Sequence, residues 1–254
     1  MNTVVESYFF AKVDKSPQAA TPASSADESD TVYTPGLRAS TNPIEGLNVQ
    51  AEVAWQRGNK VVSTTGAGQN FKREAMAAEA IVNYQLPVLK EWKPVVTGVY
   101  SYTSGDSNPD DRASFTEKSR EKWTGWDPMF ENQGGGTVYN TLFDLTNSHI
   151  YIVSGQVNVI EDLLAKISWT GIWIDRPERD GLLTIRQPDG TTDTMLIDNG
   201  DTEVGHEIDA ELIYDYTEDV QLGLNLGWFA PGDLFLSAND NVASQAIVHA
   251  DVNF

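Results

Sequence analysis

Apolar and polar residues alternate strictly along much of this chain. The clearest runs span 47–56, 207–216, 220–228 and 245–254. A period of two is the pattern of a β-strand with one apolar and one polar face, and it does not fit an amphipathic helix. Weaker runs bring the predicted strands to about ten, and they lie near 3–13, 31–41, 71–86, 93–104, 147–159 and 163–175.

The predicted strands are long, and the connections between them alternate between long and short. Runs of about 9 to 13 residues exceed the five or six typical of soluble sheets and match the length that crosses a bilayer at a tilt. Short turns on one side and long loops on the other are typical of bacterial outer-membrane barrels. We therefore predict an all-β, antiparallel up-and-down transmembrane β-barrel, as a single domain over residues 1–254. Its external loops are expected near 14–30, 58–70, 105–146, 176–204 and 229–243.

The chain ends on an alternating run that closes with an aromatic residue. Ala250, Val252 and Phe254 share the apolar face of the last predicted strand. This ending is similar to the signal that the bacterial barrel-assembly machinery reads, so these three residues are the predicted assembly signal. Aromatic residues near strand ends are expected to form a girdle at the lipid headgroups; they are Trp55, Tyr100, Tyr102, Trp173, Tyr214, Tyr216 and Trp228.

Composition narrows the partners more than the fold. The 254 residues carry a formal charge of −20, which would repel nucleic acid. No run of about 18 apolar residues predicts a transmembrane helix, and the 40 % hydrophobic content fits a soluble protein or a barrel. The sequence contains no cysteine, which suits an oxidising compartment. Strand periodicity begins at Met1 without a signal peptide, so we expect an N-terminally truncated chain.

Short motifs give the chain a family resemblance. The stretch from Gly205-His206-Glu207-Ile208-Asp209 to Phe229-Ala230-Pro231-Gly232 resembles the penultimate hairpin of the alginate-export family of outer-membrane barrels. Tyr102-Thr103-Ser104-Gly105-Asp106 and Trp126-Asp127-Pro128-Met129-Phe130 are similar to that family as well. The resemblance implies a barrel of about eighteen strands, of which this chain would supply the C-terminal portion. It also implies the outer membrane of a Gram-negative bacterium and passage of a saccharide.

The polar face of the strands is expected to line the lumen. Candidate pore-lining residues are Lys12, Arg38, Glu52, Gln56, Arg73, Glu79, Lys166, Glu207, Asp209, Glu211 and Asp215. A channel for an acidic polysaccharide is expected to be strongly basic, whereas this set is mixed and favours cations. The acidic strand at 207–215 has a second interpretation, in which its carboxylates are paired with Lys and Arg for stability. Both interpretations stay open at this stage.

The longest predicted loop is the candidate gate. Loops beyond about fifteen residues are usually functional or disordered, and residues 105–146 either cap the barrel or fold into it. The gating candidates are Trp123, Trp126, Asp127, Met129 and Phe130. Oxygen-rich positions at Asp106, Asp110 and Asp111, or at Asp233, Asn239 and Asp240, suit a divalent cation, but neither set has EF-hand spacing and plain solvated acidity is the preferred interpretation. No metal or cofactor is therefore predicted.

Motifs for catalysis are missing from the sequence. The three histidines, His149, His206 and His249, have no nucleophile elbow, phosphate loop or zinc motif around them. We predict a porin-like channel for polar or charged solutes, with saccharide export as the implied use, and not an enzyme. A barrel hydrolase and a structural or adhesive β-protein are the alternatives. The expected partners are outer-membrane lipid and lipopolysaccharide, the barrel-assembly machinery, and a polar solute or saccharide in the lumen.

Overall fold

The computed structural model describes residues 2–15, 29–62, 69–107, 122–129, 134–177, 182–186, 191–198 and 200–253. Phe130 and Phe254, one gating candidate and one assembly-signal candidate, lie outside these ranges. Ten long strands dominate the described chain: β1 (Asn2–Asp14), β2 (Asp30–Ile44), β3 (Leu47–Val62), β4 (Gln69–Gln85), β5 (Val95–Thr103), β7 (Ser148–Ile160), β8 (Leu163–Ile174), β11 (Glu203–Thr217), β12 (Val220–Pro231) and β13 (Ala243–Val252). Each of the ten predicted runs corresponds to one of them.

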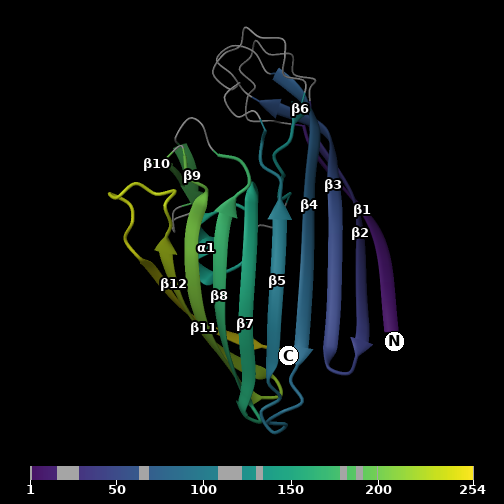
Figure 1. Cartoon of the computed structure of the whole chain (residues 1–254), viewed down its shortest axis with the longest axis vertical. Helices are drawn as coiled ribbons and strands as arrows, with labels where there is room; N and C mark the ends of the chain where they lie inside the picture. The colour runs from purple at the N-terminus through teal and green to yellow at the C-terminus, as the bar shows by residue number, and fades with distance from the viewer. Residues whose placement is uncertain are drawn as a thin grey trace.

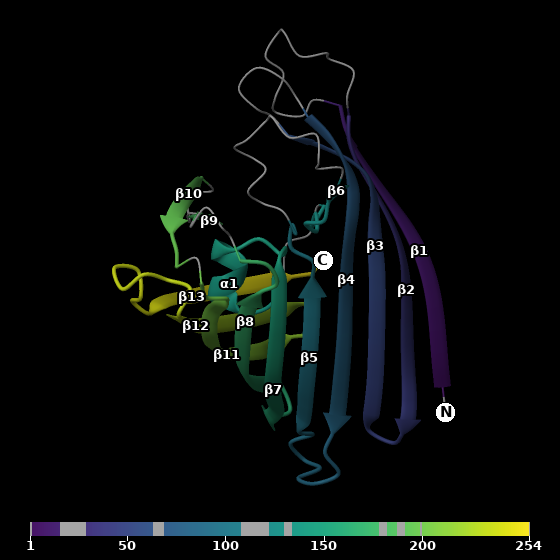
Figure 2. The ribbon, with the colours of Figure 1, turned by 45° about the horizontal axis from the view of Figure 1, so that its top comes forward.

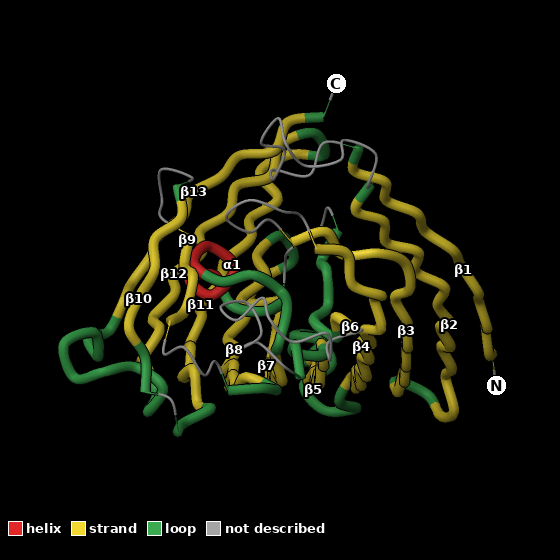
Figure 3. Tube along the Cα trace, turned by 90° about the horizontal axis from the view of Figure 1, so that it is seen from above, coloured by secondary structure: helices red, strands yellow, loops and turns green. Residues whose placement is uncertain are grey.

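The ten strands form a single antiparallel meander. Their order in the sheet is β1-β2-β3-β4-β5-β7-β8-β11-β12-β13, which is also their order in the chain. The two-residue strand β6 (Lys122–Trp123) adds to β4 in parallel, and β9 (Leu182–Arg186) pairs with β10 (Thr192–Leu196) in a separate hairpin. The sheet curves into an arch (Figure 1) whose concave side holds the short helix α1 (Thr137–Leu142), as Figure 3 shows from above.

The all-β antiparallel class is confirmed, whereas a closed barrel is not seen. Among the described strands, β1 pairs with β2 alone and β13 with β12 alone, so the arch has two open edges. Figure 2 shows the long strands β1 to β4 standing side by side, with β1 at one edge. Within the described residues no helix is long and apolar enough to cross a membrane.

The connections differ in length from those predicted at two places. β3 and β4 continue to Val62 and Gln69, so the connection expected at 58–70 comprises only residues 63–68. The next connection, residues 86–94, is longer than that and contains two left-handed residues, Leu89 and Lys93. Turns 45–46, 161–162 and 218–219 are as short as expected, and Gly46 supplies the positive φ of 77° that the first of them requires. Strict alternation in length therefore fails around β4.

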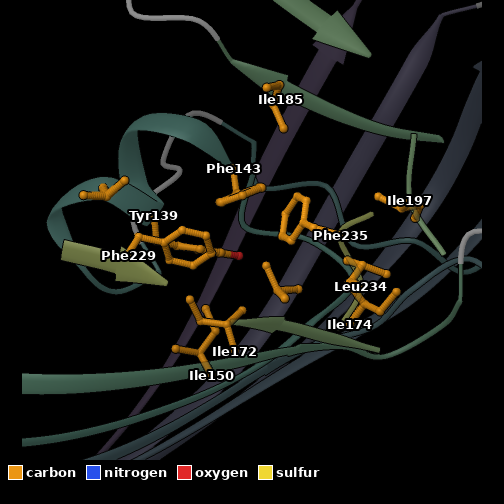
Figure 4. Packing of buried hydrophobic residues seen from close by; sticks show 12 residues of the cluster. Tyr139, Phe143, Ile150, Ile172, Ile174, Ile185, Ile197, Phe229, Leu234 and Phe235 are labelled. Carbon is orange, nitrogen blue, oxygen red and sulfur yellow. The ribbon is translucent and has the colours of Figure 1, made fainter. Parts of the chain in front are cut away.

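An apolar core fills part of the concave side. Tyr139 and Phe143 from the α1 segment pack against Ile150, Ile172 and Phe229 of the sheet (Figure 4). The same cluster extends to residues of the β9–β10 hairpin and the β12–β13 connection: Ile185, Ile197, Leu234 and Phe235. The concave face of β7 and β8 is therefore apolar where it meets α1, and the expectation of a polar face along every strand does not hold there.

Candidate functional site

The strand register assigns each residue to one of the two faces of the sheet. Residues directly opposite in a ladder share a face, and residues two apart along a strand do as well. This rule places all eleven pore-lining candidates on the concave face: Lys12, Arg38, Glu52, Gln56, Arg73, Glu79, Lys166, Glu207, Asp209, Glu211 and Asp215. That they line a pore remains a prediction.

The convex face is apolar and exposed. Val248, Val5 and Val153 have exposed fractions of 80 %, 71 % and 54 %. Six of the seven predicted girdle aromatics lie on this face by register, whereas Tyr216 falls in the bulge between Asp215 and Thr217 and has no partner in the register. Val252 and Ala250 of the predicted assembly signal lie on the convex face too. A contiguous apolar face of this size is unusual for a soluble monomer and marks an interaction surface, for a membrane or for another protein.

Residues 122–129 of the long connection cross the concave side of β1 to β4. The Asp127 carboxylate lies 3.0 Å from Lys12 Nζ and 3.4 Å from Arg73 Nη2. The Gln56 amide meets the Asp127 backbone twice, donating to its carbonyl at 2.7 Å and accepting from its N–H at 2.9 Å. Three of the predicted pore-lining residues thus hold one of the predicted gating residues against the wall. We call Lys12, Gln56, Arg73 and Asp127 the latch.

Arg73 is the centre of the latch. Its side chain is 1 % exposed, and Nη2 also lies 2.9 Å from Asp30 Oδ1 at the start of β2. Lys60 reaches the other oxygen of Asp30 at 3.4 Å. A buried guanidinium requires such partners, because an unpaired charge away from water is costly. Burial raises the pKa of Asp127, but the Lys12 hydrogen bond, the Met129 backbone N–H and the Arg73 charge outweigh it and lower that pKa below its ordinary value.

The other gating candidates that the structure describes also contact the concave side. Lys60 Nζ lies 5.6 Å from the ring centroid of Trp123, and Thr34 Oγ1 donates to Met129 Sδ at 3.4 Å. Trp126 is held through its backbone, whose N–H donates to the Ser104 carbonyl and whose carbonyl accepts from Thr146. Of the two placements left open for the long connection, the described part therefore folds inward.

A second contact holds α1 on the opposite half of the arch. The Glu207 carboxylate accepts the backbone N–H groups of Val138 at 2.6 Å and Tyr139 at 2.9 Å, and Asp209 accepts that of Thr137 at 3.0 Å. Free N–H groups and a partial positive charge at a helix start favour such carboxylates. Glu207 and Asp209 thus secure the helix. Among the described contacts, the partners of these two carboxylates are backbone N–H groups and not Lys or Arg, so the ion pairs of the stability interpretation are not seen for them. The sequence of α1 has no signal that indicated this contact.

The remaining concave charges have weaker partners. Glu211 lies 3.6 Å from Lys166, in the ion pair that the stability interpretation predicted. Arg38 donates to Gln50, Ser101 donates to Glu79, and Gln221 donates to Asp215. Tyr8 donates to Glu52. Glu52 and Glu79 stand directly opposite each other on β3 and β4, an arrangement that repulsion disfavours.

Among the clefts beside the inward segments, two are lined by carboxylates of the concave strand face. One of about 210 Å³ is lined by Glu52, Glu79, Tyr8 and Trp126. The other, of about 420 Å³, lies beside α1 and is lined by polar residues that include Lys166, Glu211 and Asn225. Both clefts therefore present carboxylates to a solute in the concavity.

The histidines do not form a catalytic arrangement with a nucleophile in the described contacts. His149 and His206 lie on the convex face by register, where they meet Asp175 at 3.4 Å and Glu203 at 3.0 Å. His249 lies on the concave face, 3.8 Å from Asp251. In the part of the chain that the structure describes, no group of three or more His, Asp or Glu side chains is arranged to hold a metal ion.

The fold is a long antiparallel meander with an apolar convex face, a charged concave face and an inward-folded connection. The chain matches the model of the alginate export family over residues 3–249 and belongs to that family. This is a transport family of the Gram-negative outer membrane, associated with polysaccharide export, and not an enzyme family. A comparison with curated proteins gave no match.

Proposed function

We propose that this chain forms the wall and the constriction of an outer-membrane channel for polar or charged solutes, with saccharides as the substrate class. The observation that carries the proposal is the segregation of the two faces: exposed valines, leucines and aromatics cover the convex side, while the concave side carries the charges and the inward connection. An apolar outer face with a polar interior is the arrangement that a strand wall needs in lipid.

The inward connection sets the width of the proposed channel. The latch holds residues 122–129 to β1–β4, and Glu207 with Asp209 holds α1 to β11. Both attachments use charged groups away from bulk water, where hydrogen bonds to charges are worth about 1.5–3 kcal/mol each. The described parts of the connection, residues 122–129 and α1, therefore form a fixed constriction of the proposed lumen.

The charge of the wall favours cationic and neutral solutes over polyanions. Five basic residues lie on the concave face of the ten strands, namely Lys12, Arg38, Lys60, Arg73 and Lys166. Ten acidic residues share it, namely Glu6, Asp14, Asp30, Glu52, Glu79, Glu207, Asp209, Glu211, Asp215 and Asp251. Since a ring of carboxylates attracts cations, we propose a cation-preferring pore that passes neutral oligosaccharides better than oligouronates.

The reversal potential across a planar bilayer in a salt gradient tests this proposal. The wild-type channel is expected to prefer K⁺ over Cl⁻, and the Glu52→Gln/Glu79→Gln double variant is expected to lose much of that preference. Glu45→Gln/Glu91→Gln instead removes two exposed carboxylates from the turn 45–46 and the connection 86–94, and is expected to change selectivity little. An anion-selective wild-type channel, or no conductance from a folded chain, contradicts the proposal.

A further inference from the structure

The convex face is nearly free of charge, and its charges gather in one place. Among the described residues of the ten strands, the register puts four Asp, Glu, Lys or Arg side chains on this face. Glu203 lies alone at the bulge of β11, and the other three are Arg57, Lys72 and Glu74. The three residues are neighbours, since Arg57 stands directly opposite Glu74 and Lys72 precedes Glu74 by two positions. Charges are expensive on a lipid-facing surface, about 2–4 kcal/mol for Arg or Lys at the bilayer midplane, so this exception needs an explanation.

β6 adds a third cation to the group. Lys122 stands opposite Lys72 in the parallel β4–β6 pair, and its Nζ lies 2.7 Å from Glu74 Oε2. Glu74 is within electrostatic reach of Lys122, Arg57 and Lys72 together. We call these four residues the convex patch. Its net charge is +2, from three cations and one carboxylate, in a chain whose formal charge is −20.

The convex patch lies at the border of the apolar band. Along β4 the outward residues from Tyr84 to Met76 are uncharged. Along β3 the uncharged outward residues continue to Trp55, and the next outward residue is Arg57 of the patch. Met76 to Tyr84 spans about 27 Å along the strand, or about 21 Å across a membrane at a tilt of about 40°, close to the usual 25 Å band. Trp55 and Met76 are 37 % and 40 % exposed. The patch therefore stands where headgroups meet acyl chains.

We propose that the convex patch binds a phosphate of lipid A, the anionic headgroup of the outer leaflet, with its acyl chains against the apolar band below. A ligand that contacts both surfaces must be an amphiphile with an anionic head. The Arg57 guanidinium has about five N–H donors, and in the described contacts one of them goes to the Gln56 carbonyl. The ammonium groups of Lys72 and Lys122 belong to the same patch. This inference rests on the membrane position proposed above.

Binding of bis-phosphorylated lipid A to the detergent-folded full chain, measured by native mass spectrometry, tests the inference. Its dephosphorylated form is the matched probe. Lys72→Gln/Lys122→Gln is expected to weaken binding of the phosphorylated form about 25-fold, since each cation near an anionic surface contributes about fivefold. Lys90→Gln/Lys93→Gln removes two exposed lysines from the 86–94 connection at the other end of β4 and is expected to bind as the wild type does.

A variant that is expected to strengthen binding makes the test independent of folding losses, because misfolding would only weaken binding. Glu74→Gln removes the one carboxylate and is expected to strengthen binding about fivefold. Equal binding of both lipid A forms, unchanged binding by Lys72→Gln/Lys122→Gln, equal loss in the Lys90→Gln/Lys93→Gln control, or weaker binding by Glu74→Gln overturns the inference. Insertion into vesicles is scored separately by heat-modifiable gel migration. A chain that inserts but binds both lipid A forms equally contradicts only the lipid-binding inference. A chain that never inserts contradicts the proposed channel as well.

Discussion

Glu207 on β11 accepts the backbone N–H of Val138 in α1 at 2.6 Å, across 69 positions of sequence. The side chain of Glu207 is fully buried, with an exposed fraction of 0 %. A strand carboxylate thus supplies the cap that α1 lacks in its own sequence, because Gly136 at the helix start offers no side-chain acceptor. The interior of the arch is organised around this contact and around the latch.

Removal of the Glu207 carboxylate is expected to release α1. Glu207→Ala leaves the N–H groups of Val138 and Tyr139 without acceptors, each at a cost of about 1–3 kcal/mol when buried. We expect protease cleavage within 134–147 and a larger channel conductance. Limited proteolysis of the folded protein in detergent, followed by mass spectrometry, measures the release.

Glu211→Ala is the matched control on the same strand and face. Glu211 lies 3.6 Å from Lys166 at a partly exposed position, so its loss is expected to cost less than about 1 kcal/mol. Equal protease sensitivity of the two variants would show that the Glu207 contact does not hold α1.

Arg73→Met is expected to destabilise the fold strongly. It leaves Asp30 and Asp127 facing each other without the cation between them, and breaking a buried charged cluster from one side costs about 3–5 kcal/mol. Arg38→Met is the control, because Arg38 is exposed and its guanidinium donates to Gln50. Urea unfolding in lipid vesicles, monitored by tryptophan fluorescence, compares the two. Midpoints lowered equally would contradict a special role of the latch.

The latch is expected to respond to acid and not to mild changes of pH. The pKa of Asp127 is lower in the folded protein than its ordinary value of about 3.9. A lowered pKa gives stability that is fully present above the ordinary value and is lost as pH falls through the folded value. Asp127 is therefore expected to leave the conductance constant from pH 7 down to its ordinary pKa, and the conductance is expected to rise only in stronger acid.

Asp127→Asn supplies the comparison for this pH dependence. The variant lacks the carboxylate that Lys12 and Arg73 contact, so its channel is expected to be wider at pH 7 and to show no further step in acid. A wild-type opening step centred above pH 5, retained in the variant, would assign the response to other groups.

Neighbouring residues on β13 distinguish the two faces. Val248 stands on the convex face and Ile247 on the concave face, where it lines the cleft beside α1. Val248→Arg is expected to reduce folding into vesicles, by about 2–4 kcal/mol if the position lies near the bilayer midplane, and Ile247→Arg much less. Folding yield by gel shift measures both. A greater loss from Ile247→Arg would reverse the assignment of the faces.

Period-two patterning was sufficient to predict the ten strands and their faces. Each strand in this topology pairs with the strands next to it in the sequence. The alternation of residues such as Val53 and Trp55 therefore predicts both the strand and the face on which each residue lies. The end of β3 was missed because Lys60 and Val61 show no alternation that distinguishes a strand from a loop; their contacts to Asp30 explain why the strand continues.

The interior could not be predicted in the same way. The helix α1 spans six residues, too few for a periodic signal, and it depends on Glu207 and Asp209 from a distant strand. The Arg73 partners are likewise distant from it in sequence, since Asp30 begins β2 and Asp127 lies in the long connection. Sequence reasoning identified Arg73, Gln56 and Asp127 as candidates one at a time, but their assembly into one latch is a property of the tertiary structure.

Conductance in a planar bilayer, with and without the inward connection, tests the central claim most directly. The variant replaces residues 122–146 with a glycine-serine linker, which removes the latch carboxylate and α1 but leaves the ten strands intact. The account predicts a conducting wild-type channel, a severalfold larger conductance in the variant, and a cation preference in both. A wild-type chain that inserts and does not conduct, or a variant with the wild-type conductance, would contradict it.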